Sequence, residues 1–171
     1  MRTLIIQLPT GTPQPSLAYA HAVVTPESAS PSLALQWAVS TLLPTSTTPT
    51  ETVVLVPALA LSWHRVTLPE GLAKQPARWL PALQGVLEDR LLDDPALLHM
   101  ALQPDWAHAP QPWVAVCDRA WLSAHLQALE QAGVQVHRIV PELHPPLEAQ
   151  PPLITALGDA DSSWLWVSHP E

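Results

Sequence analysis

Proline-rich breaks divide this chain of 171 residues into short segments. Of its 21 prolines, five fall within residues 141–152, and others interrupt 9–15 and 44–52. Proline lacks an amide hydrogen and its ring clashes with the preceding helical turn, so these segments do not suit a helix interior or a central strand. We therefore expect four parts, which span residues 1–50, 52–140, 141–152 and 153–171.

The first part, residues 1–50, predicts an antiparallel meander. Apolar and polar residues alternate over 3–8, 17–23 and 33–39, which is the period of a strand with one buried face. A short helix over 33–43 is the alternative for the third of these segments. Three consecutive strands favour a meander with antiparallel pairing.

The second part, residues 52–140, predicts an α+β block with the element order ββαββαβ. Its strands are expected at 53–56, 62–68, 97–102, 113–117 and 134–140. The first helix has leucines at helical spacing and ends near Leu92, with Pro81 in its first turn. The second helix is expected to begin at Asp118, whose carboxylate accepts backbone N–H bonds, and to end at Gly133 in a left-handed cap.

The last two parts predict a linker and a hairpin. Residues 141–152 are too rich in proline for a helix and are expected to be extended. Residues 153–157 and 164–167 are apolar and flank a turn at 158–161, which indicates a β-hairpin. Because a lone hairpin is only marginally stable, we expect the chain to be truncated within a further subdomain.

Charge and cysteine content exclude several classes of protein. The net charge is −8, and the seven Lys and Arg residues are scattered along the sequence. Nucleic-acid binding and basic membrane-surface helices both need clustered positive charge, so neither is expected. No window supplies the roughly twenty apolar residues of a membrane span. Cys117 is the only cysteine, which rules out an internal disulfide, and its apolar strand predicts a buried thiol.

No catalytic, metal or cofactor site stands out. The eight histidines show no close ligand spacing of the kind that zinc sites use. None of the serines lies on the tight, glycine-flanked turn of a hydrolase nucleophile. Phosphate loops need several glycines so that backbone N–H groups can approach the anion, whereas Gly11 and Gly158 are isolated. We therefore expect neither an enzyme nor a cofactor.

Four segments carry a resemblance to a known family. They are 63–69 (WHRVTLP), 87–95 (LEDRLLDDP), 113–122 (WVAVCDRAWL) and 138–142 (RIVPE). As a set they resemble the cytoplasmic part of type II secretion system protein L, most firmly over 53–142. The resemblance implies a partial actin-like (ribonuclease H-like) fold, in which the ββαββαβ block is an inserted subdomain and the final hairpin opens a second actin-like subdomain.

The same resemblance implies a function and partners. The family is a non-enzymatic scaffold of the bacterial inner-membrane platform, a bitopic inner-membrane protein with this part on the cytoplasmic side. The implied partner is the secretion ATPase E, bound through its N-terminal domain. Secretion protein M would be met mainly through parts absent here. The resemblance also admits a homodimer, and it implies no membrane contact by this fragment itself.

Two alternatives keep the actin-like fold with another function. One is an actin-like nucleotide-binding protein, and the other is an adaptor similar to pilus assembly protein M. Actin-like ATPases carry an Asp-x-Gly turn after the first strand and a glycine-rich turn in the second half. Here these turns read 8–12 (LPTGT) and 158–162 (GDADS), so nucleotide binding is not favoured, although Asp159 and Asp161 have the chemistry to hold a cation.

Five residues are candidates for partner binding. Glu88, Asp89, Asp93 and Asp94 form the densest charge cluster and follow the first helix of the block. Acids at a helix C-terminus oppose its dipole at a cost of a few tenths of a kcal/mol each. An acidic surface for a basic partner would explain them, while Asp94 alternatively caps a turn that begins at Pro95. The fifth residue is Trp106, either an exposed loop anchor or a side chain folded back as a plug.

Overall fold

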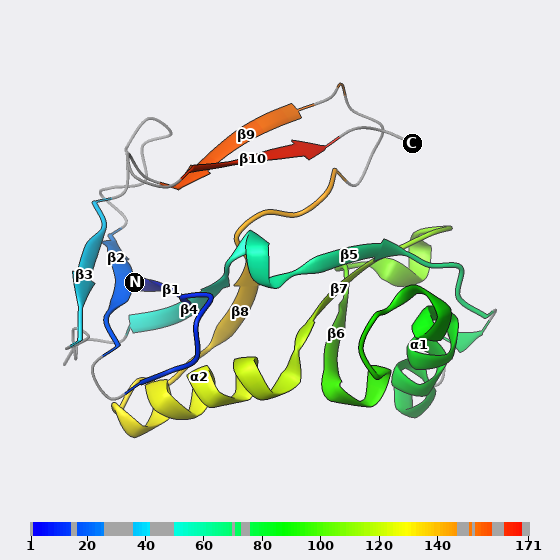
Figure 1. Cartoon of the computed structure of the whole chain (residues 1–171), viewed down its shortest axis with the longest axis horizontal. Helices are drawn as coiled ribbons and strands as arrows, with labels where there is room; N and C mark the ends of the chain where they lie inside the picture. The colour runs from blue at the N-terminus through cyan, green and yellow to red at the C-terminus, as the bar shows by residue number, and fades with distance from the viewer. Residues whose placement is uncertain are drawn as a thin grey trace.

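A computed structural model describes residues 2–14, 17–25, 36–41, 50–69, 71–72, 76–146, 151, 153–158 and 163–168. Within these residues the fold is mixed α/β, with three sheets and two α-helices (Figure 1). None of the helices in the described part of the chain is long and apolar enough to cross a membrane.

The first sheet has five strands in the order β3-β2-β1-β4-β8. They are β3 (Ala38–Ser40), β2 (Tyr19–Val24), β1 (Arg2–Gln7), β4 (Thr50–Val56) and β8 (Arg138–Pro141). The pairs β1–β2 and β2–β3 are antiparallel, which confirms the predicted meander, and 38–40 form a strand rather than a helix. The expected start of that strand, 33–35, lies outside the described residues.

Strand pairing distributes the predicted ββαββαβ block over two sheets. β4 pairs with β1 in parallel, and β8 pairs with β4 in parallel, so both belong to the sheet of the meander. Alternation of apolar and polar residues indicates a half-buried strand, but it does not indicate which strand lies beside it. Parallel neighbours are far apart in sequence, because a long crossover connects them. Residues 50–52, expected to end a linker between two parts, instead begin β4 and pair with β1, so the predicted boundary there is wrong.

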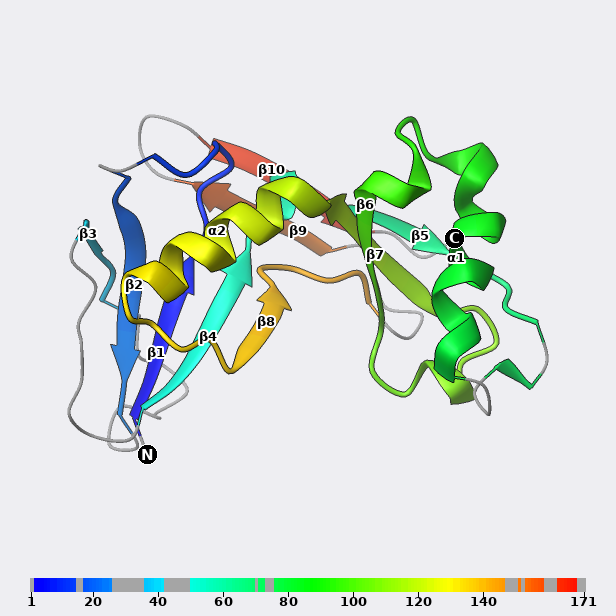
Figure 2. The same ribbon diagram turned by 90° about the horizontal axis from the view of Figure 1, so that it is seen from below.

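Helix α2 (Arg119–Gln131) covers one face of the first sheet (Figure 2). The core between them contains Leu4, Ile6, Val54, Leu122 and Leu129. Asp118 caps the helix as predicted, because its Oδ1 accepts a hydrogen bond from the Trp121 amide at 2.6 Å. Gly133 has a φ of 77°, which confirms the left-handed cap.

The second sheet carries helix α1 and has the order β5-β7-β6. Its strands β5 (Ser62–Arg65), β7 (Trp113–Asp118) and β6 (Leu98–Leu102) pair antiparallel. Helix α1 (Trp79–Leu87) packs Leu83 and Leu87, both fully buried, against the cluster that includes Val66, Met100 and Val114. Pro81 is the third residue of α1, in the first turn as expected. The helix is shorter than predicted, because residues after Leu87 tighten into a 3₁₀ turn.

The final hairpin and the segment before it complete the described chain. β9 (Leu153–Gly158) and β10 (Ser163–Ser168) pair antiparallel, as predicted, and the turn 159–162 lies outside the described residues. The hairpin lies on the side of the first sheet opposite α2 (Figure 1). The described part of the linker is not wholly exposed: Pro145 is buried, and the Trp113 indole donates to the Pro146 carbonyl at 3.3 Å.

Candidate partner-binding surface

The acidic turn, residues 88–97, follows α1 without a break. It consists of η5 (Glu88–Arg90), a bend, and η6 (Pro95–Leu97). Leu83 and Leu87 of α1 are buried in the core, whereas most residues of the turn are exposed. All four acids of the cluster, Glu88, Asp89, Asp93 and Asp94, are exposed.

Asp94 has a structural role within this turn. Its Oδ1 accepts a hydrogen bond from the Ala96 amide at 2.8 Å and caps η6, with Pro95 at the first position. The capping alternative for Asp94 is therefore confirmed. Within the described part of the chain, the carboxylates of Glu88, Asp89 and Asp93 have neither a hydrogen bond nor an ion pair. These three remain available to an external partner.

Hydrogen bonds hold the acidic turn against the second sheet. Arg90 Nη1 donates to the Arg65 carbonyl at 2.8 Å, and Gln84 Nε2 donates to the Pro95 carbonyl at 3.4 Å. The Arg65 guanidinium in turn lies over the Trp113 ring, 4.9 Å from its centroid. Arg90 is thus engaged with backbone rather than with the neighbouring acids, and the turn presents a fixed negative surface.

Two exposed leucines accompany the acids, and sequence reasoning missed both. Leu92 is 105% exposed and Leu97 is 64% exposed, whereas Leu91 is partly buried against the core of the second sheet. The two leucines give this charged turn exposed apolar surface that a partner could cover. The exposure of Leu92 could have been predicted from the sequence. Leu91 completes the apolar stripe of the helix, so the adjacent Leu92 cannot also face the core.

Trp106 lies in another part of the inserted region. It begins η7 (Trp106–His108) after Asp105, which has a φ of 56°, and its side chain is half-buried. It lines a small cavity of about 160 Å³ together with Leu68, Leu72 and Pro110. The indole is therefore neither a free loop anchor nor a fully buried plug, and it packs with this loop cluster rather than with the acidic turn.

A second hollow, the strand-end cleft, lies between the segment after β1 and the final hairpin. The cleft has a volume of about 350 Å³ and lies at the carboxyl ends of the parallel strands β1, β4 and β8, where open α/β sheets bind ligands. Residues 7–10 line one side, and Leu157, Gly158 and Trp164 of the hairpin line another. Asp159 and Asp161, the possible cation ligands, lie outside the described residues.

Glu142 occupies this cleft and was missed from the sequence. Its Oε1 accepts a hydrogen bond from Gln7 Nε2 at 2.7 Å, and its Oε2 accepts one from the Ala58 amide at 2.9 Å. The side chain thus ties together the ends of β1, β4 and β8. A carboxylate at this point repels phosphate, and only its position in the 138–142 motif hinted at a special role.

The turn after β1 is fastened to α2 through a buried histidine. His125 is fully buried, and its Nε2 donates to the Gly11 carbonyl at 2.8 Å, while Trp121 Nε1 donates to the same oxygen at 3.2 Å. The Tyr19 hydroxyl lies 3.1 Å from His125 Nδ1 and serves as the donor to it. Burial lowers the pKa of His125, offset in part by the Gly11 carbonyl, so the neutral ring is favoured.

The single thiol is buried as expected. Cys117 is 6% exposed, and burial together with the nearby Asp118 charge raises its pKa to about 11. A protonated, buried thiol is a poor nucleophile. Among the described residues, no three His, Cys, Asp or Glu side chains gather closely enough to hold a metal ion.

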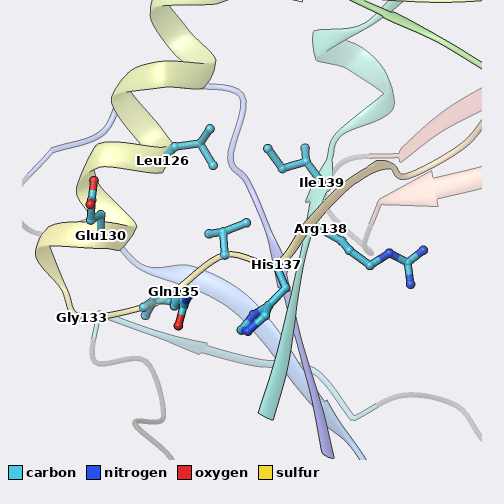
Figure 3. Close-up of a pocket in the computed structure, with 9 residues that line it drawn as sticks. Leu126, Glu130, Gly133, Gln135, His137, Arg138 and Ile139 are labelled. Atoms are coloured by element: carbon cyan, nitrogen blue, oxygen red, sulfur yellow. The ribbon is translucent and has the colours of Figure 1, made fainter. Parts of the chain in front are cut away.

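An open groove runs between α2 and the edge strand β8 (Figure 3). Leu126 of α2 and Ile139 of β8 point toward each other across it, and Glu130 stands on the helix side (Figure 3). The His137 side chain is bonded to the neighbouring strand, because its Nδ1 accepts a hydrogen bond from the Thr52 amide at 3.1 Å. Ile139 is 44% exposed. No candidate residue of the sequence analysis lies in this groove.

Comparisons with known proteins agree with the predicted resemblance. A family model described as type II secretion system (T2SS), protein L matches residues 22–165. Type II secretion system protein L of Dickeya chrysanthemi is 32% identical over 116 residues, which cover 68% of this chain and 25% of that protein. The chain therefore spans about a quarter of that relative's length.

One solved structure shows the same fold. The cytoplasmic domain of EpsL, an inner membrane component of the type II secretion system of Vibrio cholerae, superposes with a TM-score of 0.68 at 22% identity. The match covers 96% of this chain and 67% of that one. A chain of the PilM-PilN type IV pilus biogenesis complex gives a TM-score of 0.41 at 16% identity, over 82% of this chain and 46% of that chain.

Proposed function

Because the chain belongs to the type II secretion system protein L family, we propose that it is a non-enzymatic scaffold that recruits the secretion ATPase E through the N-terminal domain of that enzyme. The observation that carries this proposal is the acidic turn, where three unpaired carboxylates and the exposed side chain of Leu92 occur within six residues of sequence. Secretion protein M is proposed as a further partner, reached mainly through parts of the protein absent from this chain.

The chemistry of the acidic turn suits a basic, partly apolar partner. Fixed carboxylates raise the association rate with a positively charged surface, and salt screens this effect. Leu92 and Leu97 supply the apolar area, and transfer of exposed leucine from water is favourable by roughly 25 cal/mol per Å². Since the turn is held by Arg90 and Gln84, little conformational entropy is lost when it binds.

The proposed location is the cytoplasmic side of the inner membrane. Support comes from the fold, which is that of a cytoplasmic domain of an inner-membrane secretion component. The net charge of −8 and the scattered basic residues give this chain no attraction to anionic lipid or to nucleic acid. The membrane-spanning segment of the family would lie outside this chain.

The chemistry of the strand-end cleft favours a scaffold function over nucleotide binding. Glu142 places a carboxylate there, and the Gly11 carbonyl of the turn after β1 accepts hydrogen bonds from His125 and Trp121. Calorimetry with Mg-ATP is expected to show no heat of binding. A micromolar dissociation constant would instead favour the nucleotide-binding alternative.

The decisive experiment titrates the chain with the N-terminal domain of the ATPase. The variant Glu88→Gln/Asp89→Asn/Asp93→Asn is expected to fold normally and to bind roughly tenfold more weakly at low salt, with the difference shrinking as salt rises. Glu130→Gln is the matched control, because it removes an exposed helix carboxylate on another surface. Binding of the triple variant equal to that of the parent at low salt would place the interface elsewhere.

A further inference from the structure

The strand-end cleft combines one carboxylate with apolar walls. Glu142 is half-buried and lies among Pro57, Leu59, Leu157 and Trp164. We propose that this cleft binds an arginine side chain of a protein partner, with the Glu142 carboxylate as its counter-ion. This site is separate from the acidic turn and does not depend on ATPase recruitment.

Charge is the first argument for a cationic occupant. None of the described residues that line the cleft is Lys, Arg or His. The nearest Lys or Arg in sequence to Glu142 is Arg138, and its guanidinium pairs with Glu51 at 3.6 Å. His144 is closer in sequence but exposed, and its Nδ1 lies 2.8 Å from the Pro145 carbonyl. Within the described residues the Glu142 carboxylate has two hydrogen-bond donors and no ion pair, so an entering guanidinium would supply its cation.

Hydrogen-bond geometry favours a guanidinium over a simple ammonium. Each carboxylate oxygen accepts from one protein donor, Gln7 Nε2 on Oε1 and the Ala58 amide on Oε2. A carboxylate has about four acceptor positions, so each oxygen retains one. Two acceptors fixed in one plane match the paired N–H groups of arginine, which binds carboxylates in a bidentate manner.

The apolar walls fit the rest of an arginine side chain. Leu59 is 57% exposed and Trp164 is 51% exposed, so both present uncovered surface to a partner. A methylene stem packs favourably on leucine, and a guanidinium stacks on an indole face. A nucleotide is disfavoured, because its phosphates would approach Glu142 without a compensating cation.

The test uses two short capped peptides, Ac-Leu-Arg-Leu-amide and the same peptide with neutral citrulline in place of arginine. Binding to the whole chain is followed by ¹H–¹⁵N NMR, with the Gly158 amide and the Trp164 indole as reporters of the cleft. The arginine peptide is expected to shift both signals and to bind roughly tenfold more tightly than the citrulline peptide. Equal binding of the two peptides, or shifts confined to other residues, would overturn the proposal.

Two variants locate the effect. Glu142→Gln keeps one acceptor for the protein donors and is expected to remove the preference for arginine, whereas Glu130→Gln, with the same change on α2, should leave it intact. Leu59→Lys leaves Glu142 untouched and places a competing cation at an exposed position, so it provides the same test if Glu142→Gln does not fold. Unchanged arginine binding in a folded cleft variant would refute the assignment.

Discussion

His125 Nε2 lies 2.8 Å from the backbone carbonyl oxygen of Gly11, although the two residues are 114 positions apart in the sequence. Through this bond the turn after β1 is attached to the middle of α2. The ring of His125 also contacts Tyr19 and Trp121 edge-on, with centroid distances of 5.9 and 5.2 Å. One histidine thus joins a strand, a turn and a helix that form a single core.

Replacing this histidine should destabilise the fold. His125→Ala removes a fully buried ring and the acceptor of the Tyr19 hydroxyl, and it leaves the Gly11 carbonyl with Trp121 as its remaining donor. We expect the free energy of unfolding to fall by about 2–4 kcal/mol, measured by urea denaturation. His125→Gln, which retains a donor, should lose less, and His108→Ala at an exposed position should have no measurable effect. A loss below about 1 kcal/mol in His125→Ala would contradict this account.

Stability should fall as the pH is lowered from neutral toward 5.5. Burial lowers the pKa values of His125, His64 and His99 in the folded chain, with Arg90 and Arg119 adding to the effect at His64 and His99. Between each lowered pKa and the ordinary value of about 6.5, the unfolded state binds more protons than the folded state. The stabilising contribution of each histidine is therefore fully present above pH 6.5, and it is lost as the pH falls through the pKa of that histidine in the folded chain.

The measurement is urea unfolding at several pH values between 7.5 and 5.5. A flatter pH dependence in His125→Gln would identify this residue as a contributor. A free energy of unfolding that rises as the pH falls from 7.5 to 5.5 would contradict the predicted direction of the pH dependence.

Leu92 should matter for ATPase binding and not for folding. Its side chain is fully exposed, so Leu92→Ser is expected to change the free energy of unfolding by less than about 0.5 kcal/mol. At the centre of an interface the same change should weaken binding roughly tenfold. Ile139→Ser is the matched control, an apolar-to-serine change at an exposed position beside α2. Isothermal titration with the N-terminal domain of the ATPase compares the two, and equal affinities would remove Leu92 from the interface.

Cys117 should resist thiol reagents in the folded chain. With a pKa of about 11, only about one thiol in a thousand is ionised at pH 8, and the sulfur is also buried. Labelling by a disulfide reagent should be slow in buffer and complete in concentrated urea, monitored by absorbance. Rapid labelling under native conditions would reveal a reactive, accessible thiol.

Local features of the fold could be predicted from the sequence. Asp118 and Gly133 marked the two ends of α2, because their capping chemistry depends on neighbouring residues alone. The strands of the meander and the final hairpin likewise followed from alternation of apolar residues. The family resemblance implied an actin-like fold, and the solved cytoplasmic domain of EpsL shares the fold of this chain.

Long-range relationships could not be predicted in the same way. The parallel pairing of β1 with β4 joins residues about fifty positions apart, and no local pattern encodes it. Glu142 and His125 acquire their roles only when distant backbone groups, Ala58 and Gly11, are brought beside them. At the acidic turn the charges were visible in sequence, but the exposure of Leu92 depended on where α1 ends. Whether these residues bind a partner remains a prediction.

The junction of β7 and α2 has a mechanical consequence. The strand ends at Asp118 and the helix begins at Arg119, with no loop residue between them. Arg119 Nη2 also donates to the Leu98 carbonyl of β6 at 2.8 Å, which braces the joint. A partner that displaced the second sheet would therefore displace the start of α2 with it, and α2 is hydrogen-bonded to the Gly11 turn through His125. A displacement of the second sheet would thus reach the turn after β1 through this helix.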